Sequence, residues 1–349
     1  MKQQRIEFLD LSKGLCISLV VMYHVFGLSS GKYLDIINLF RMPLYFVLSG
    51  IFFKPSYGFK VFLKKKINKL LIPFLITLAA ISVPGAFLLD YIQHKPTDIW
   101  DFLPDNHLHI PIYISIASWF LLCLFNLNML FFALFKICKG KMMAMAVCAC
   151  CLGAAGYVFG KEGIILPLWL DSTMTAAPFF MAGIFIKNST SILEENYNSR
   201  LTRIATVALL LLLAAHTIDV SPENATLSYK DNVFSINMAS LYLGGMCGFL
   251  LIFIISKHLD RLPIFSYIGR YSIVVLITHQ IYLFILRNVL YQLGMPQDNI
   301  YLNIAVFILI ILLELPTIKY GIKYCPYWFA QKDLLVGKEC RGQTIQARP

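Results

Sequence analysis

The chain has 349 residues, of which 58% are hydrophobic and only 14% are charged. Soluble domains are about half apolar and about a quarter charged, so this composition excludes an ordinary soluble domain and indicates a multi-pass membrane protein. The formal net charge of +11 would suggest nucleic-acid binding in a soluble chain, but in a membrane protein it is typical of basic loops at an anionic lipid surface.

The first predicted helix starts near Glu7 and contains an apolar run from Gly14 to Gly27 that His24 interrupts. An imidazole in such a span is costly unless it faces a partner or a wet cavity, so His24 is either hydrogen-bonded to a neighbouring helix or functional, and we favour function. Lys13 lies eleven positions earlier. Helix geometry places the two side chains within roughly 20° of each other and about 16 Å apart along the axis. This arrangement suits a ligand with an anionic head and a long arm.

Ten apolar spans follow one another along the chain. Basic residues concentrate in the loops that lie on the same side of the membrane as the N-terminus. The spans cover about 14–30, 36–54, 70–92, 112–136, 142–160, 167–187, 203–219, 234–257, 270–290 and 300–322. Pro167 and Pro178 predict that the sixth span is broken or kinked. The charge bias predicts cytoplasmic N- and C-termini. We therefore predict an all-α polytopic membrane helix bundle, with one domain over 1–325 and a polar cytoplasmic tail at 326–349.

Polar residues in or beside the first spans are further candidates, each with a structural alternative. Asp10 is either a helix N-cap or a partner that holds Lys13 or Lys69 in place. Arg41 lies inside the second span and either pairs with Asp35 or contacts an anionic ligand. Ser49 and Gly50 either allow close helix packing or offer a hydroxyl to the site, and packing is the favoured reading.

Later candidates also have a structural explanation beside the functional one. Lys65, Lys66 and Lys69 lie in a basic run that is either an ordinary topology signal or a phosphate clamp. Trp119 is favoured as an interfacial anchor over a substrate platform. Glu314 is expected to pair with Lys319.

Neither the cysteines nor the polar loop at 93–111 has the spacing of a metal site. Three of the nine cysteines crowd into the fifth span, where they are interpreted as small apolar residues. The loop is rich in Asp and His but lacks a zinc-binding pattern, so we interpret it as a solvated loop. We predict no disulfide and no metal.

Five short stretches resemble motifs of the acyltransferase-3 family of integral-membrane acyltransferases, and they occur in the family's order. They are Leu9-Asp10-x-x-Lys13-Gly14 with His24, Tyr45-Phe46-Val47-Leu48-Ser49-Gly50, Lys66-x-x-Lys69 before Pro73, Ser118-Trp119-Phe120-Leu121, and Gly269-x-x-Ser272 leading to His279. The family shows Arg or Lys, ten residues, then His, which Lys13 and His24 match. Its third motif is typically Arg-x-x-Arg. Lysine here binds phosphate as a point charge, without the bidentate fork of arginine.

The resemblance implies an acyl-CoA-dependent O-acyltransferase that moves an acyl group, expected to be acetyl, to a hydroxyl of a cell-surface or lipid-linked glycan. It would thereby modify a polysaccharide by O-acetylation. The implied catalytic residues are His24 as general base, Asp10 and His279. The implied donor-binding residues are Lys13, Lys65, Lys66, Lys69 and Ser49, and the implied acceptor-binding residues are Arg41, Trp119 and Ser272.

The same resemblance implies the partners and the location. Acetyl-CoA or another acyl-CoA is the expected donor, and no nucleic acid is expected. Membrane lipid and a second copy of the chain are further expected partners. The expected location is the bacterial inner membrane, with many passes through it.

A transporter or flippase for a sugar or lipid-linked sugar is the competing function. Intramembrane His24, Arg41, His279 and Glu314, together with a broken sixth span, would also suit a substrate pathway. The sequence has no evident inverted repeat, however, and its inner cations gather around one helix. These two features favour the acyltransferase.

Overall fold

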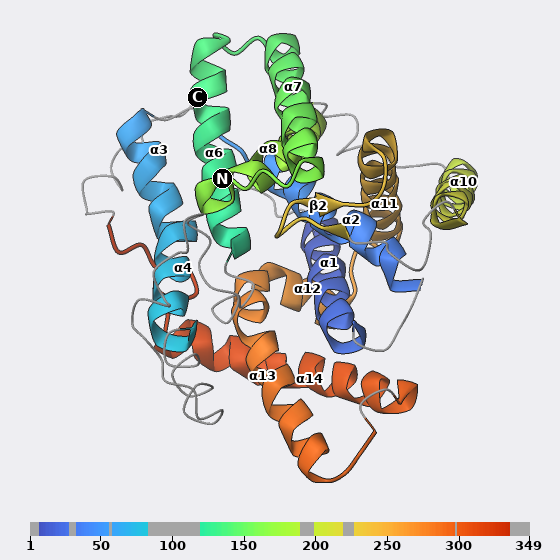
Figure 1. Cartoon of the computed structure of the whole chain (residues 1–349). Coiled ribbons are helices and arrows are strands. Elements are labelled where there is room, and N and C mark those ends of the chain that lie inside the picture. The colour runs from blue at the N-terminus through green and yellow to red at the C-terminus, as the bar shows by residue number, and fades with distance from the viewer. Residues whose placement is uncertain are drawn as a thin grey trace.

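The computed structural model describes residues 7–27, 33–55, 58–82, 119–188, 199–218, 227–296 and 299–335, without the side chains of 33–35, 82, 199–202 and 215–218. The loop at 93–111 and the C-terminal residues 336–349 therefore lie outside the described residues. Figure 1 shows that the described chain is a bundle of helices with one short hairpin.

The first half of the chain contains α1 (Glu7–Phe26), α2 (Tyr33–Ile51), α3 (Phe59–Lys66), the π-helical turn η1 (Ile67–Leu71), α4 (Ile72–Thr77), a second π-helical turn η2 (Leu78–Ser82), α6 (Trp119–Ile137) and α7 (Met142–Lys161). The second half contains the 3₁₀ turn η5 (Pro167–Trp169), α8 (Leu170–Asn188), α10 (Ser199–Ile218), α11 (Met238–Leu259), α12 (Pro263–Arg270), α13 (Ser272–Gln292) and α14 (Ile300–Tyr324). Strands β1 (Leu227–Ser228) and β2 (Val233–Phe234) form an antiparallel hairpin.

Among the described residues, seven helices are long and apolar enough to cross a membrane: α1, α6, α7, η5 with α8, α11, α13 and α14. Two shorter apolar helices, Ile36–Ile51 and Arg203–Ala214, coincide with the second and seventh predicted spans. The third predicted span continues past Ser82, beyond the described residues. The prediction of a multi-pass helical membrane protein is confirmed. The count of ten spans and the cytoplasmic termini stay predictions.

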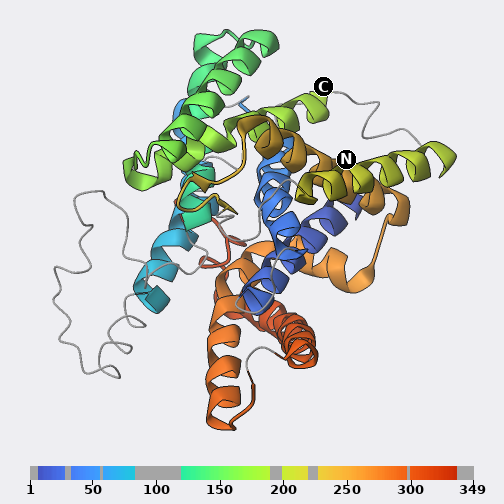
Figure 2. The same ribbon diagram turned by 45° about the vertical axis from the view of Figure 1, so that its right-hand side comes forward.

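Helices α1 and α2 form the centre of the bundle. In Figures 1 and 2 the pair α6 and α7 lies at one end and the pair α13 and α14 at the other, with α1 and α2 between them. Helix α1 packs against α2, α11, α12, α13 and α14, while α2 packs against α8 and α11. Apolar side chains of α1 such as Leu11, Cys16 and Ile17 are fully buried. The helix that carries His24 is thus enclosed by protein, and its interior face is fixed by packing.

The contact between α1 and α12 depends on two glycines. A methyl group on Gly14 would overlap the carbonyl oxygen of Phe265, and one on Gly269 would overlap the carbonyl oxygen of Asp10. The two backbones touch only because neither residue has a Cβ. The Gly269-x-x-Ser272 stretch therefore sets the position of α12 against α1.

The predicted break in the sixth span lies at its start. Leu168 and Trp169 have φ values of +59° and +56°, so the 3₁₀ turn η5 joins α8 through left-handed residues. Asp171 and Pro178 lie inside the continuous helix α8. The break therefore precedes the polar residues Asp171, Ser172 and Thr173 of α8.

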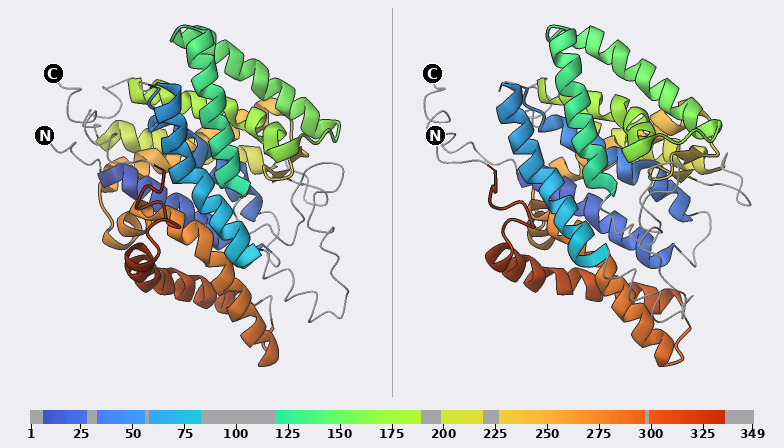
Figure 3. Two further views of the ribbon diagram at one scale, coloured as in Figure 1. Left: turned by 90° about the vertical axis from the view of Figure 1, so that its left-hand side faces the viewer. Right: turned by 60° about the vertical axis from the view of Figure 1, so that its left-hand side comes forward.

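Residues 325–335 lie against the long helical rod formed by α3, η1, α4 and η2, which runs alongside α6 in Figure 3. The side-chain oxygen of buried Asn68 accepts hydrogen bonds from the backbone N–H groups of Leu334 and Leu335, at 2.8 and 2.9 Å. Trp328 Nε1 donates to Thr77 Oγ1 at 2.9 Å. The first part of the predicted tail is thus anchored to the bundle, and its cytoplasmic location stays a prediction.

Candidate active site

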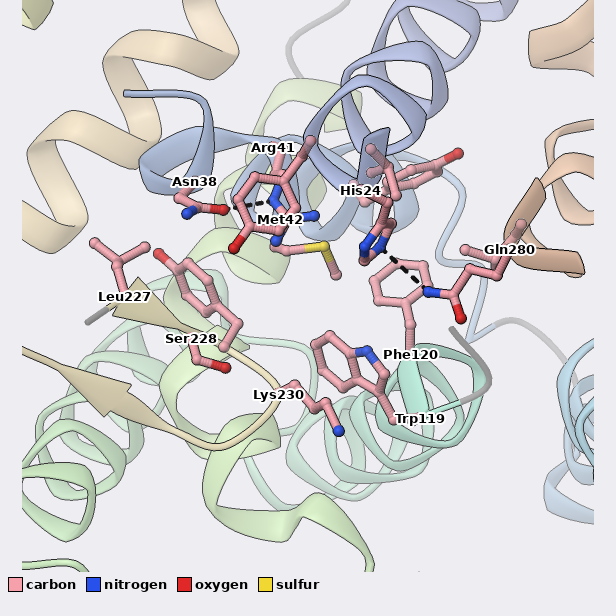
Figure 4. Close-up of a pocket in the computed structure, with 15 residues that line it drawn as sticks. His24, Asn38, Arg41, Met42, Trp119, Phe120, Leu227, Ser228, Lys230 and Gln280 are labelled. Carbon is pink, nitrogen blue, oxygen red and sulfur yellow. Dashed lines mark hydrogen bonds between the residues drawn. The ribbon is translucent and has the colours of Figure 1, made fainter. Parts of the chain in front are cut away.

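A cavity of about 190 Å³ lies where α1, α2, α6, α13 and the β1–β2 hairpin meet (Figure 4). Its walls combine apolar and aromatic side chains with polar and basic ones. The lining residues are Val20, Tyr23, His24, Asn38, Arg41, Met42, Tyr45, Trp119, Phe120, Leu227, Ser228, Tyr229, Lys230, Leu276 and Gln280. Three predicted site residues, His24, Arg41 and Trp119, are therefore brought together from three different helices.

His24 lies in the last turn of α1 and meets two polar residues of α13. Nε2 of Gln280 lies 3.4 Å from Nε2 of His24. The ring of His279 has its centroid 5.3 Å from that of His24, with the planes tilted by 33°. The structure thus places both predicted histidines together, and of the two only His24 is a lining residue of the cavity. A neutral imidazole at the cavity wall can accept a proton from a bound hydroxyl.

His279 is almost completely buried, and its own helix fixes its tautomer. Nδ1 lies 2.6 Å from the carbonyl oxygen of Val275, so Nδ1 carries the proton and donates it. Nε2 of His279 then has a lone pair and no hydrogen-bond partner among the described residues. Ser272, one of the predicted acceptor-binding residues, begins α13 and does not line the cavity.

Arg41 forms the wall of the cavity on the α2 side. Its Nε donates to Asn38 Oδ1 at 3.0 Å, and its guanidinium lies 3.6 Å from the centre of the Tyr23 ring. Cation–π contact and this hydrogen bond hold the guanidinium plane against the cavity. The side chain of Asp35, the predicted partner, lies outside the described residues.

Trp119 begins α6 and is only 9% exposed. It packs edge-on against Phe120, with ring centroids 6.0 Å apart. An interfacial anchor would be exposed to lipid or headgroups, whereas this indole is enclosed and lines the cavity. The burial argues against the favoured anchor, and a substrate-binding role for Trp119 stays a prediction.

The predicted donor-binding lysines lie away from the cavity. Lys13 lies 3.8 Å from the centre of the Phe52 ring, and Lys66 lies 5.4 Å from that of Phe62. Phe62 in turn packs edge-on against Phe53, whose carbonyl oxygen accepts a hydrogen bond from Lys187. Three lysines from α1, α3 and α8 therefore surround the end of α2. None of the predicted donor-binding residues, Lys13, Ser49, Lys65, Lys66 and Lys69, lines the described cavity.

The two lysines Lys66 and Lys187 lie close enough to interact. Burial, together with the neighbouring charge of Lys187, lowers the pKa of Lys66, which precedes the third predicted span, to about 8. A half-buried cation beside a like charge is stabilised when an anion binds, so this cluster is suited to phosphate.

Lys69 and Asp10 have partners that the sequence did not indicate. Lys69 Nζ lies 3.2 Å from Asp333 Oδ1 and donates to the carbonyl oxygen of Ala330 at 2.6 Å. Asp10 lies inside α1, so it is not an N-cap, and its Oδ2 is 3.5 Å from Nε of Arg270. Asp10 thus ties α1 to α12, and of the two lysines it was expected to hold, Lys69 pairs with Asp333 instead.

Packing decides the roles of Glu314 and Gly50. Glu314 is fully buried on α14, and Thr278 Oγ1 lies 2.8 Å from its carboxylate oxygens, so the expected pair with Lys319 was wrong. A methyl group on Gly50 would overlap the carbonyl oxygen of Phe180 on α8, which is the close helix packing favoured for the Ser49-Gly50 step.

Sequence reasoning missed Gln280, Lys187 and Lys230. Gln280 had a usable signal, because it is an amide directly after an intramembrane histidine in an apolar span. Lys187 and Lys230 had none, since a lysine at the end of a helix or in a short loop is ordinary. In the part of the chain that the structure describes, no group of three His, Cys, Asp or Glu side chains is placed to hold a metal ion.

The bundle and its polar interior cavity define an integral-membrane protein with a buried histidine site. The model of the acyltransferase-3 family, described as an acyltransferase domain, matches residues 6–318. The chain belongs to this family, and its first and last matching residues enclose the motifs around both His24 and His279. No curated protein and no solved structure matches the chain.

Proposed function

We propose that this membrane acyltransferase transfers an acetyl group from cytoplasmic acyl-CoA to a hydroxyl of a cell-surface or lipid-linked glycan in the bacterial inner membrane. The observation that carries the proposal is the position of His24. It is the one histidine of the facing pair that lines the cavity, and it lies beside Gln280 and opposite basic side chains.

In the proposed reaction His24 acts as the general base. Its imidazole removes the proton of the acceptor hydroxyl as the oxygen attacks the thioester carbonyl carbon. The tetrahedral intermediate then collapses, the carbon–sulfur bond breaks, and the proton passes from the imidazolium to the leaving thiolate. The products are the O-acetylated acceptor and coenzyme A. His279, whose ring centroid lies 5.3 Å from that of His24 and which is not a lining residue of the cavity, would support this role by holding the His24 ring in place.

The lysines around the end of α2 are the proposed donor site. Lys13, Lys66 and Lys187 would hold the phosphates of coenzyme A, and the pantetheine arm would extend along α1 toward His24. The separation of Lys13 and His24 by about 16 Å along one helix supports this fit. Lys69 has a smaller role in the proposal because its ammonium already contacts Asp333 and Ala330.

The test is coenzyme A release from acetyl-CoA by the purified full chain in detergent, with glycan acceptors and no gradient. His24→Ala should reduce the rate by about 10²–10⁴-fold, the size of a lost general base, while acetyl-CoA binding stays unchanged. His258→Ala is the matched control because His258 is exposed at the end of α11. Absence of acetyl-CoA binding by folded wild-type protein would refute the proposal and favour the transporter.

A further inference from the structure

The cavity beside His24 has a positive charge that the general base does not require. Arg41 from α2 and Lys230 from the hairpin both line it, and none of the described lining residues is Asp or Glu. In Figure 4, Lys230 and Trp119 lie across the cavity from Arg41 and Asn38. Two cations that face one small space attract an anion, because no described acid in the wall offsets their field.

The hairpin fixes the position of Lys230. On one side of it, Tyr229 is only 3% exposed. On the other side, Asn232 has a φ of +52° and is buried. Its Nδ2 donates to the carbonyl oxygen of Gly156 at 2.8 Å, and its Oδ1 accepts from Thr175 Oγ1 at 2.7 Å. Because both neighbouring segments are anchored, the backbone at Lys230 is held at the rim of the cavity.

The adjacent acid does not neutralise Lys230. Asp231 is exposed, and its Oδ2 accepts a hydrogen bond from Ser228 Oγ at 2.7 Å. No carboxylate in the described part of the chain lies within ion-pair distance of the Lys230 ammonium. Lys230 therefore keeps a charge that no described carboxylate offsets, and it lines the cavity.

We propose that Arg41 and Lys230 bind an anionic group of the acceptor, a carboxylate or a phosphate, and thereby place its hydroxyl at His24. The inference rests on the proposed acyl transfer and adds the chemical class of the acceptor. Arg41 offers a planar fork that fits either oxyanion, and Lys230 supplies a point charge opposite it. The cavity is small, about 190 Å³, so an anion between the two cations leaves the attached sugar ring within reach of the imidazole.

Ligand binding without donor tests the inference separately from catalysis. Full-length protein in detergent is titrated with a hexose, the corresponding hexuronic acid and the corresponding hexose 1-phosphate, and tryptophan fluorescence reports occupancy because Trp119 lines the cavity. At least one of the two anions should bind about tenfold or more tightly than the hexose, and the preference should weaken as salt is added. The anion that binds more tightly identifies the acceptor as a sugar acid or a sugar phosphate. Equal binding of all three ligands would overturn the inference.

Variants show whether the preference comes from this site. Lys230→Met should reduce the preference for the anion about tenfold, and Lys230→Arg should keep it. Lys161→Met is the matched control, since Lys161 is exposed near the same hairpin and donates to the Ser235 carbonyl oxygen at 3.4 Å. An equal loss in both Met variants would overturn the inference, as would weaker acetyl-CoA binding by Lys230→Met. If coenzyme A release fails with every acceptor while the anion preference persists, the acyl-transfer proposal fails and the anion site stands.

Discussion

Substitution of Gly269 by Ala should destabilise the bundle, because it adds a methyl group where α12 touches α1. That methyl would overlap the carbonyl group of Asp10 and the backbone nitrogen of Gly14, which are parts of a helix backbone and cannot rotate away. The added carbon would lie 1.8 Å from the Asp10 carbonyl oxygen, so the two atoms must move apart by about 1.5–1.8 Å to restore an ordinary carbon–oxygen contact of about 3.3–3.6 Å. Overpacking of this kind costs about 1–3 kcal/mol. The same displacement lengthens the 3.5 Å contact of Arg270 with Asp10.

The assay is the apparent melting temperature of purified protein in detergent, measured at one scan rate because large proteins often unfold irreversibly. A cost of about 1–3 kcal/mol corresponds to a decrease of several degrees in a chain of this size. Gly58→Ala is the control: Gly58 has a φ of −58°, which any residue adopts, and no atom lies within 4 Å of the added methyl. Equal melting temperatures for the two variants would refute the close-packing argument.

Three further predictions concern the site and its surroundings. Acetyl-CoA binding should weaken about fivefold to tenfold between pH 7 and 9, because Lys66, whose pKa is lowered to about 8, loses its charge as the pH rises. Lys66→Arg should show no such decrease, and a decrease in that variant would exclude Lys66 as the cause. Gln280→Ala should lower kcat about twofold to tenfold by removing the neighbour of His24, without changing donor affinity; a changed affinity and an unchanged kcat would contradict this role. Asn68→Ala should speed proteolysis of the C-terminal segment several-fold, because two backbone N–H groups lose their acceptor. Asp333→Asn removes only a half-exposed ion pair and should leave the proteolysis rate unchanged. Equal rates for the two variants would show that Asn68 does not anchor the segment.

The amino-acid sequence determined that the protein spans a membrane, and it determined which residues share one face of the first helix. Apolar runs of span length allow little except transmembrane helices, since each backbone group must be hydrogen-bonded within the membrane. The helical repeat alone then relates Lys13 to His24, because both belong to one continuous helix. Short motifs in a fixed order were enough to suggest the family that the matching residues 6–318 confirm.

Only the tertiary structure decided which distant residues meet. Gln280 reaches His24 across 256 positions of sequence. Lys230 reaches the cavity from the turn between two strands of two residues each, which are too short to give a strong local signal. Lys69, which belongs to a motif, contacts the C-terminal segment instead of the cavity. Periodicity reports which side chains share a face of one helix, but it carries no information on which helices pack together. That choice depends on close contacts such as Gly14 against α12, and it determines the chemistry available around His24.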